Sequence, residues 1–416
     1  MMSRCLSLVM LLGSLSLLLE PSAAWADKPP RFVALLANGQ RIEGNTLTEW
    51  HNNGAMPRID GKPLLEPQAM LRWQRDRWLL PGALPKAFVE MHTGDRLPGT
   101  VFDFSQGTDA PFALQPPHFR VRPEFEIKPP QKEREPVIRV VASFVKRVVW
   151  QRRDRDDYQP STLFYRDGRS VQFRAVRFGN GFANLLLSDG NRRVSFNEIA
   201  EIHLPAVSPW QAYFDELAAL GLWGNESRLL QIDTNEGLIL TSSTDRRQFH
   251  GGGGNAQEFQ RWSHGLQPAW SLDEIYAATT GVWARRMWLP HEVPLSHIAP
   301  TPIATRSPLS ATGRAPQTNR NVQGGPLRAG QQDYGFGFGV QAQSELAFDL
   351  PEGVKALRGR VGLDKLAGRG GCVRARIFAN SSSTSPLWES PYLVGSEVDA
   401  DLGTIGLAGP AQGQKQ

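Results

Sequence analysis

Residues Tyr334 to Ser396 determine how the C-terminal part of the chain is expected to fold. Polar and apolar residues alternate in segments of this stretch, as they do in strands that bury one face. The segments are Tyr334-Gly-Phe-Gly-Phe-Gly-Val-Gln-Ala342, Ser344-Glu-Leu-Ala-Phe-Asp-Leu-Pro351, Arg360-Val-Gly-Leu-Asp364, Gly371-Cys-Val-Arg-Ala-Arg-Ile-Phe-Ala379 and Leu387-Trp-Glu-Ser390. The stretch therefore predicts one β module.

The order of these segments resembles the carbohydrate-binding module first noticed beside the catalytic domain of family 98 glycoside hydrolases. The resemblance covers residues 295–416 and implies a jelly-roll, galactose-binding-like β-sandwich that binds glycans and performs no chemistry. In the family, further strands follow the position of Val398-Asp-Ala-Asp-Leu402, whereas this chain ends at Gln416. The sandwich is therefore expected to lack its last strands.

Candidate ligand-binding residues follow from this resemblance and from the chemistry of sugars. Sugars lie with their C–H faces on aromatic rings, while polar side chains fix the hydroxyl groups. Tyr334, Trp388 and Tyr392 fit this chemistry. The two tyrosines stand at strand margins and are expected to be exposed, whereas an aromatic residue inside a strand, such as Trp388, more often belongs to a core.

Asp364 is the fourth candidate, because the family places an acidic pair at this point. In this chain the second position of the pair is Lys365. Calcium bound by two carboxylates is thus left open for the C-terminal module, and no other cofactor is expected.

Upstream, residues 27–290 contain a degenerate repeat of a strand, a glycine-containing turn and a second strand. Asn-Gly and Asp-Gly within alternating segments are strong hairpin signals, because both residues tolerate positive φ. The copies are Phe32–Gly44, Phe88–Gly99, Leu163–Phe173 and Leu185–Phe196, and Leu229–Thr241 is a further strand of similar character. A hairpin is stable only when one of its faces is buried against neighbouring strands. The hairpins are therefore expected to form small SH3-like barrels or one curved sheet, and the strands that close this arrangement are expected in Val137–Trp150 and Phe196–Leu204. The whole chain is predicted to be all-β.

One helix and three loops are expected between these strands. The helix follows Ser208-Pro209, because Trp210, Phe214 and Leu217 then share one face that could cover a sheet. Composition favours loops or linkers at Gln106–Pro136, Thr241–Gln257 and Pro300–Gly330.

The N-terminus has the pattern of an export signal. Basic Met1-Met-Ser-Arg4 precedes an apolar run, Leu6–Leu19, and Ala24-Trp25-Ala26 provides the small residues of a cleavage site. The run is shorter than the roughly 20 residues that span a bilayer as a helix. Residues 1–26 are therefore expected to be a signal peptide of a secreted, periplasmic or cell-envelope protein, with an uncleaved anchor as the alternative.

The cysteine content and the charge pattern bear on the role of the thiol and on the kind of partner that the surface could bind. Cys5 would leave with the signal, so Cys372 is the only thiol expected in the mature chain, as a small buried side chain or, alternatively, a reactive one. The net charge is +5, but acidic residues are interleaved with arginines, as in Gln151–Asp157. This pattern favours a solvated surface of mixed sign over a nucleic-acid or anionic-polysaccharide site.

Catalytic patterns are scarce. The eight histidines never show His-x-His or His-Glu-x-x-His spacing, and there is no Gly-x-Ser-x-Gly motif. Asp215-Glu216 and Asp273-Glu274 are candidates for a carboxylate pair by chemistry alone.

The sequence favours a secreted, non-enzymatic, glycan-binding protein. The alternatives are a protein-binding structural or assembly module of the cell envelope and a divergent glycoside hydrolase.

Overall fold

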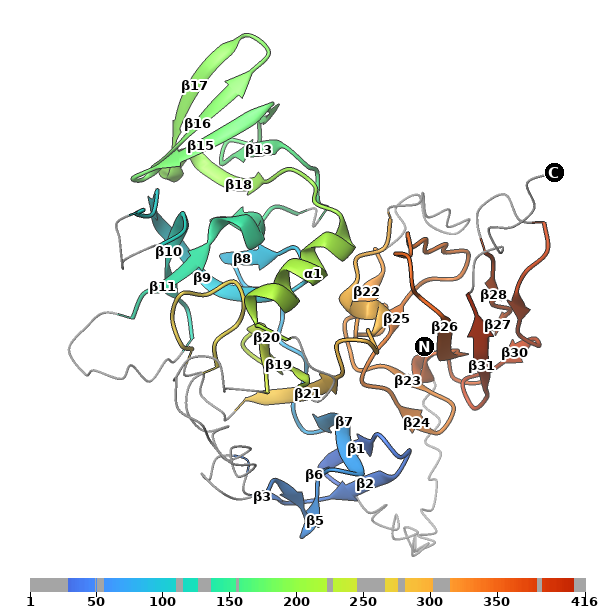
Figure 1. Cartoon of the computed structure of the whole chain (residues 1–416). Coiled ribbons are helices and arrows are strands. Elements are labelled where there is room, and N and C mark those ends of the chain that lie inside the picture. Colours follow the sequence, from blue (N-terminus) through green and yellow to red (C-terminus); the bar gives the residue numbers. More distant parts are fainter. Residues whose placement is uncertain are drawn as a thin grey trace, which may run out of the picture.

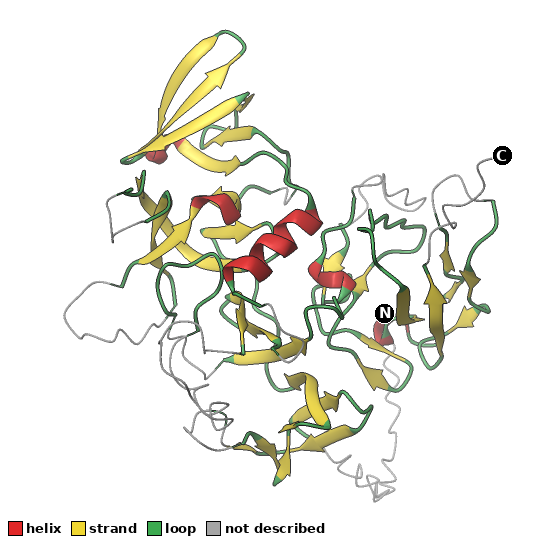
Figure 2. Ribbon diagram, viewed as in Figure 1, coloured by secondary structure: helices red, strands yellow, loops and turns green. Residues whose placement is uncertain are grey.

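A computed structural model describes residues 29–48, 50, 56–109, 115–125, 136–154, 157–222, 227–244, 266–275, 281–301, 315–379 and 384–407. The expected signal peptide, residues 1–26, lies outside the described residues. Among the described residues there are many antiparallel strands and one α-helix (Figure 2). The predicted all-β fold is confirmed.

The largest element is an antiparallel sheet of 15 strands, here called the main sheet. Its main path runs through β14 (Ser170–Gln172), β13 (Thr162–Tyr165), β18 (Ile199–His203), β12 (Val145–Val149), β8 (Phe88–Met91), β9 (Arg96–Ser105), β20 (Ile239–Ser243), β19 (Leu229–Thr234), β21 (Val282–Trp288), β7 (Ala69–Asp76), β1 (Phe32–Leu36) and β2 (Arg41–Gly44). Off this path, β10 (His118–Pro123) pairs with β9 and β11 (Ile138–Val141), and β6 (Leu65–Glu66) pairs with β7.

Two small sheets accompany the main sheet. One consists of β15 (Ala175–Gly179), β16 (Phe182–Leu187) and β17 (Gly190–Ser195), in that order. The other consists of β3 (Leu47–Thr48), β4 (Arg58–Ile59) and β5 (Lys62–Pro63). The sheet β15–β17 is green and lies at the top of Figure 1.

The four predicted hairpins are confirmed, as β1–β2, β8–β9, β13–β14 and β16–β17. The further strand expected at Leu229–Thr241 is itself a hairpin, β19–β20. The turn chemistry behaves as expected, since Gly94 and Gly168 both have a φ of 90°. A residue with a side chain would be strained in that conformation.

Two groups of strands follow the expected small-barrel pattern. In the first, β8 to β11 lead through a 3₁₀ turn, η1 (Ala142–Phe144), to β12, which returns to pair with β8. In the second, β13 to β17 lead through η2 (Phe196–Glu198) to β18, which returns to pair with β13. The expected closing segments thus contain the strands β12 and β18.

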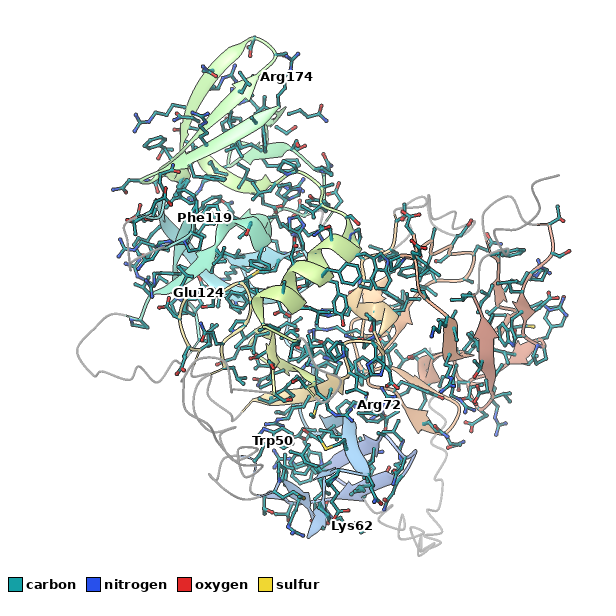
Figure 3. All side chains as sticks on the ribbon, in the orientation of Figure 1. Trp50, Lys62, Arg72, Phe119, Glu124 and Arg174 are labelled. Carbon is teal, nitrogen blue, oxygen red and sulfur yellow. The ribbon has the colours of Figure 1, made fainter. Side chains whose placement is uncertain are left out.

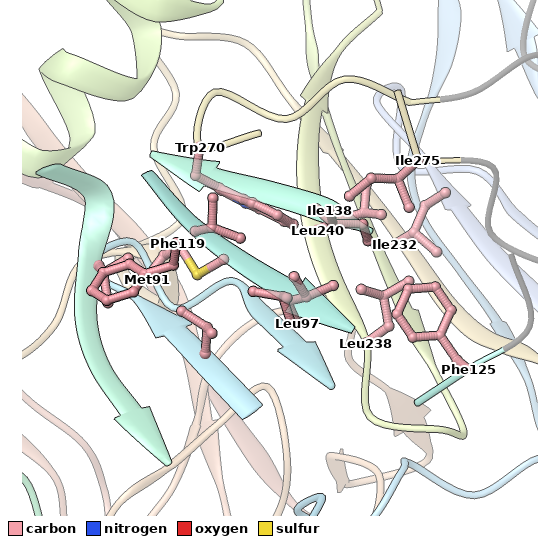
Figure 4. Close-up of a cluster of buried hydrophobic side chains, with 14 of the residues drawn as sticks. Met91, Leu97, Phe119, Phe125, Ile138, Ile232, Leu238, Leu240, Trp270 and Ile275 are labelled. Atoms are coloured by element: carbon pink, nitrogen blue, oxygen red, sulfur yellow. The ribbon is translucent and has the colours of Figure 1, made fainter. Parts of the chain in front are cut away.

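The apolar core lies between these hairpins. Phe119, Trp270 and Leu240 have no exposed surface, and they come from three different segments (Figure 4). Phe119 lies among the packed side chains, whereas Arg174 lies on the projecting three-stranded sheet (Figure 3). The hydrophobic clusters of the described residues end at Trp288, apart from the half-buried Phe336. The residues beyond Trp288 therefore contribute little to the apolar core.

The C-terminal module, residues 315–407, is built of strands that pair two by two. The pairs are β22 (Gln317–Thr318) with β25 (Phe338–Gly339), β23 (Arg328–Ala329) with β24 (Gln332–Asp333), β26 (Ala356–Gly362) with β31 (Asp399–Gly406), β27 (Cys372–Val373) with β30 (Leu393–Val394), and β28 (Arg376–Ile377) with β29 (Trp388–Glu389). Two further 3₁₀ turns are η4 (Leu295–His297) and η5 (Lys365–Ala367).

The predicted helix exists as α1 (Pro209–Ala219), but only part of the predicted face is buried: Leu217 packs against the apolar cluster that contains Trp288, whereas Phe214 is 48% exposed. The buried positions are Ala212, Tyr213 and Glu216. Polar contacts orient the helix: the Tyr213 hydroxyl donates to the Pro290 carbonyl at 2.9 Å, and Glu216 pairs with buried His297 at 2.8 Å. These polar contacts could not be predicted from the spacing of apolar residues along the helix.

Two other expectations need correction. The stretch Gln106–Pro136 is not wholly a loop, because Phe119 and Val121 alternate into the core and form β10 with their neighbours. Cys372 is exposed rather than buried, because its strand pairs over only two residues and it lies opposite Val394, which is 60% exposed. In the other two expected loops, residues 245–257 and 302–314 lie outside the described residues, and residues 315–330 contain β22 and β23.

Candidate functional site

The C-terminal module is attached to the main sheet through Asp333 on β24. Its carboxylate pairs with Arg75, with Arg77 at 2.6 Å, with Arg41 at 3.0 Å and with Arg328 at 2.9 Å. Asp333 is buried, which by itself would raise the pKa of its carboxyl, but the guanidinium groups lower that pKa to about 2. Three of these cations, Arg41 on β2, Arg75 on β7 and Arg77 directly after β7, join the module to the main sheet, whereas Arg328 belongs to the module itself.

A second contact lies two residues further along. Arg286 on β21 donates to the Gly335 carbonyl at 2.6 Å, and the Phe336 ring meets Trp288 edge-on with centroids 6.1 Å apart. A side chain at position 335 would overlap Trp73 on β7. The glycine-aromatic run is thus held close against the main sheet.

This attachment explains the environment of Tyr334, the first predicted ligand residue. Tyr334 is half-buried, and its hydroxyl donates to Asp399, which also accepts from Arg360 at 2.9 Å. Burial first, and then the hydrogen bond with Asp399, raise the pKa of Tyr334. The hydroxyl is therefore engaged within the protein, in contrast to the exposed ring that the sequence predicts.

Asp364, the second predicted residue, has a local structural contact. Its carboxylate accepts a hydrogen bond from the Leu366 amide at 2.9 Å and so caps the turn η5. Within the described ranges, no three His, Cys, Asp or Glu side chains are grouped closely enough to hold a metal ion. Asp364 thus caps a turn and belongs to no such group within those ranges.

Tyr392 fits the expected chemistry best. It is 64% exposed, and the Arg374 guanidinium lies over its ring, 4.2 Å from the centroid. Glu389 accepts from Arg374 at 2.9 Å and from Arg376 at 2.7 Å. The hydrogen bond from Arg376 lowers the pKa of Glu389. We call Arg374, Arg376, Glu389 and Tyr392 the Tyr392 cluster.

Trp388, the remaining predicted residue, is half-buried on β29 opposite Ile377. Adjacent residues of a strand face opposite sides, so Trp388 points away from Glu389. Among the described residues, no hydrogen bond, ion pair or ring contact joins Trp388 or Tyr392 to Tyr334. The predicted aromatic residues are thus not brought together in one contact network.

The sequence interpretation missed the three charged members of the Tyr392 cluster. Arg374 and Arg376 alternate with Val373, Ala375 and Ile377, so their common face was visible in the strand pattern. Their pairing with Glu389 depends on β28 pairing with β29, which the sequence alone did not specify.

The carboxylate pairs considered for hydrolysis have structural partners. Asp273 pairs with Arg139 at 2.6 Å, and Asp215 accepts from Gln211 on the exposed side of α1. Glu216 and His297 form a buried pair. These acids therefore line no common open site among the described residues.

Buried Asp95 lies near that pair. Its carboxylate accepts from the Thr241 amide at 2.6 Å and from Trp270 Nε1 at 2.8 Å. Burial and the charge of Glu216 raise the pKa of Asp95 to about 7, against the effect of these donors. Glu216 and Asp95 in turn raise the pKa of His297, although burial opposes this. With Asp95, Glu216 and His297 all buried, a substrate has no access to these groups.

Comparisons with known proteins give one match. Residues 297–405 match the NPCBM/NEW2 domain, a carbohydrate-binding type of module. The matched region begins at the end of η4 and includes every strand from β22 to β30 and most of β31. No curated protein and no solved structure matches the chain. None of the helices formed by the described residues is long and apolar enough to cross a membrane.

Proposed function

We propose that this is a secreted or cell-envelope protein that binds extracellular carbohydrate without catalysis. The observation that carries the proposal is the match of residues 297–405 to the NPCBM/NEW2 domain. We include in the proposal that the module has the galactose-binding-like fold first noticed beside family 98 glycoside hydrolases. Residues 27–290 would serve as the scaffold that presents it.

The Tyr392 cluster is the proposed binding surface. An exposed ring offers a face to a sugar, and the neighbouring guanidinium and carboxylate groups can bond to hydroxyls. Arg374, Arg376 and Glu389 hold one another through ion pairs, which limits the conformational entropy lost on binding. Such a shallow surface makes few apolar contacts, so a dissociation constant of about 1 mM is expected.

Glycan-array binding by the intact mature protein tests the proposal. Tyr392→Ala should weaken binding to any positive glycan by at least about tenfold, equivalent to about 1.4 kcal/mol. Leu366→Ala is the matched control, because Leu366 is also 64% exposed and lies on η5, outside the cluster. Absence of binding to every glycan would contradict the function, whereas normal binding by Tyr392→Ala would contradict only the site.

A protein-binding role in the cell envelope is the second candidate. The observation in its favour is the outer edge of β15 in the three-stranded sheet, with which no further strand pairs among the described residues.

A further inference from the structure

A groove runs beside strand β15, far along the chain from the proposed glycan site. It has a volume of about 720 Å³ and is lined by residues 174–178 on one side and by Phe104, Gln106, Ser143 and Leu204 on the other. β15 is an outer strand, because the strand order of its sheet is β15-β16-β17 (Figure 1). The groove therefore follows a sheet edge.

The backbone of β15 faces this groove. The Gln106 side-chain amide donates to the Phe178 carbonyl, with Nε2 2.6 Å from the oxygen. In an antiparallel sheet, alternate residues direct their N–H and C=O groups to the same edge. The N–H and C=O of Val176 are thus directed to the groove as well. At Phe178 a side chain occupies the place that a neighbouring strand would take.

The groove is positively charged. Residues 174–195 contain four arginines and one acidic residue, Asp189. Asp189 pairs with Arg192 at 3.4 Å, on the opposite edge of the sheet. Arg174 and Arg177 are exposed, line the groove and form no ion pair with a described residue, and no acidic residue lines it. Their charge is therefore available to an anionic partner.

The two faces of β15 differ in chemistry. Phe178 is buried, with its ring 5.3 Å from that of Phe104, and Val176 on the same face is half-buried. Arg177 alternates with them and so points to the other face. A strand added at this edge would place one set of alternate side chains near apolar residues and the other set near arginine.

From this geometry we propose that the groove binds an extended segment of a partner protein, in which apolar and acidic residues alternate. The segment adds to the sheet as a strand beside β15, so that main-chain hydrogen bonds provide affinity and side-chain alternation provides specificity. Opposite charges on neighbouring strands add to this stability. An acidic polysaccharide would satisfy the arginines but has no backbone amides to pair with the edge.

The test uses the intact mature protein and a labelled, terminally capped peptide of alternating Val and Glu. About six residues suffice to cover β15 at about 3.3 Å per residue. Fluorescence polarisation should show saturable binding, and the same peptide with Lys in place of Glu should bind at least about tenfold more weakly. Polygalacturonate serves as the carboxylate polysaccharide probe. No binding of the Val-Glu peptide, or binding of polygalacturonate at the groove in its place, overturns the proposal.

Charge reversal locates the site. The double variant R174E/R177E should weaken binding of the Val-Glu peptide by about tenfold, because the cross-strand pair of Arg177 becomes unfavourable and the groove's second arginine, Arg174, is replaced by a residue that repels the acidic side chains. R192E/R193E makes the same charge change on β17, at the opposite edge, and should weaken it less than about threefold. Equal losses in the two variants would show non-specific attraction and contradict strand addition.

Hydrogen exchange of the unmodified protein provides a readout that does not depend on a variant folding. Saturating Val-Glu peptide should slow exchange of the Val176 and Phe178 amides, because added main-chain hydrogen bonds protect them. The glycan site at Tyr392 should be unaffected, so failure here leaves the carbohydrate proposal intact. Unchanged exchange at β15 with bound peptide would place the peptide elsewhere.

Discussion

At the scale of single residues, Asp333 is the side chain on which the attachment of the module depends most. It is 6% exposed and faces Arg75, which is 4% exposed, so neither charge is solvated by water. Removing one partner from a buried ion pair leaves the other charge uncompensated, and this costs more than the pair itself contributes. Arg41 and Arg77 also pair with Glu43, so the loss of the Asp333 charge would fall mainly on buried Arg75.

Asp333→Asn should therefore lower the free energy of unfolding by about 3 kcal/mol. Urea unfolding followed by tryptophan fluorescence measures this change. The matched control is Asp401→Asn, because Asp401 pairs with Arg360 but is 59% exposed, and its loss should cost below about 1 kcal/mol. Equal effects of the two variants would contradict the role of Asp333. The pKa of Asp333 is about 2, so its contribution is present above its ordinary pKa of 3.8 and is lost as pH falls through 2.

Asp95 and His297 give the opposite dependence on pH. Both pKa values are raised, Asp95 to about 7 from 3.8 and His297 from 6.5, so the folded state binds these protons more tightly than the unfolded state. The contribution of Asp95 to stability should decline as pH rises from 3.8 through about 7, and that of His297 as pH rises from 6.5 upward, as each proton is lost. His92 has a lowered pKa, about 4, and its effect is confined to pH values below 6.5.

Thermal unfolding from pH 6.5 upward tests this dependence. His297→Gln should reduce the decline of the melting temperature with pH, whereas His291→Gln, at an exposed position, should leave that decline unchanged. A wild-type melting temperature that is constant or rises from pH 6.5 upward would show that the buried cluster does not titrate as described.

At the scale of elements, hairpins and strands could be predicted better than the helix face. Gly94 and Gly168 specify their turns locally, so the sequence sufficed for the hairpins. The face of α1 depends on Pro290 and His297, which are distant in sequence, and so local periodicity could not report it. The same limit applies to the candidate site. The Tyr334 hydroxyl is hydrogen-bonded to Asp399, which is distant in sequence, so the local pattern around Tyr334 could not predict this contact.

Two adjacent residues of α1 distinguish the observed face from the predicted one. Tyr213→Ala should destabilise the protein by about 3 kcal/mol, because it removes a fully buried ring. Phe214→Ala should cost less than about 1 kcal/mol, because Phe214 is 48% exposed. Chemical unfolding of the two variants measures the difference. A larger loss for Phe214→Ala would restore the face predicted from periodicity.

At the scale of the whole molecule, burial decreases from the main sheet to the end of the described chain. The apolar clusters lie within residues 32–288. Residues 315–339 are held to the main sheet by polar contacts, including Asp333, the Gly335 carbonyl, and Arg320, which donates to the Gly82 carbonyl at 2.6 Å. Among the described residues beyond 339, the buried apolar side chains are Leu393, Ala400 and Ile405. Eight large apolar side chains there are exposed: Val340, Leu350, Leu366, Phe378, Leu387, Tyr392, Val394 and Val398.

This gradient predicts three levels of local stability in native-state hydrogen exchange. Segments that bury little apolar surface open at low free energy, so peptides from 340–407 should exchange first and those from β19 and β21 last. Peptides from 315–339 should fall between them, because ion pairs and hydrogen bonds hold them, with little apolar packing beyond that of Phe336 against Trp288. Asp333→Asn should then make 315–339 exchange as fast as 340–407, while Asp401→Asn leaves the three levels unchanged. If 340–407 exchanged as slowly as β19 and β21, the stability of the module would have a source other than the burial and contacts of its described residues.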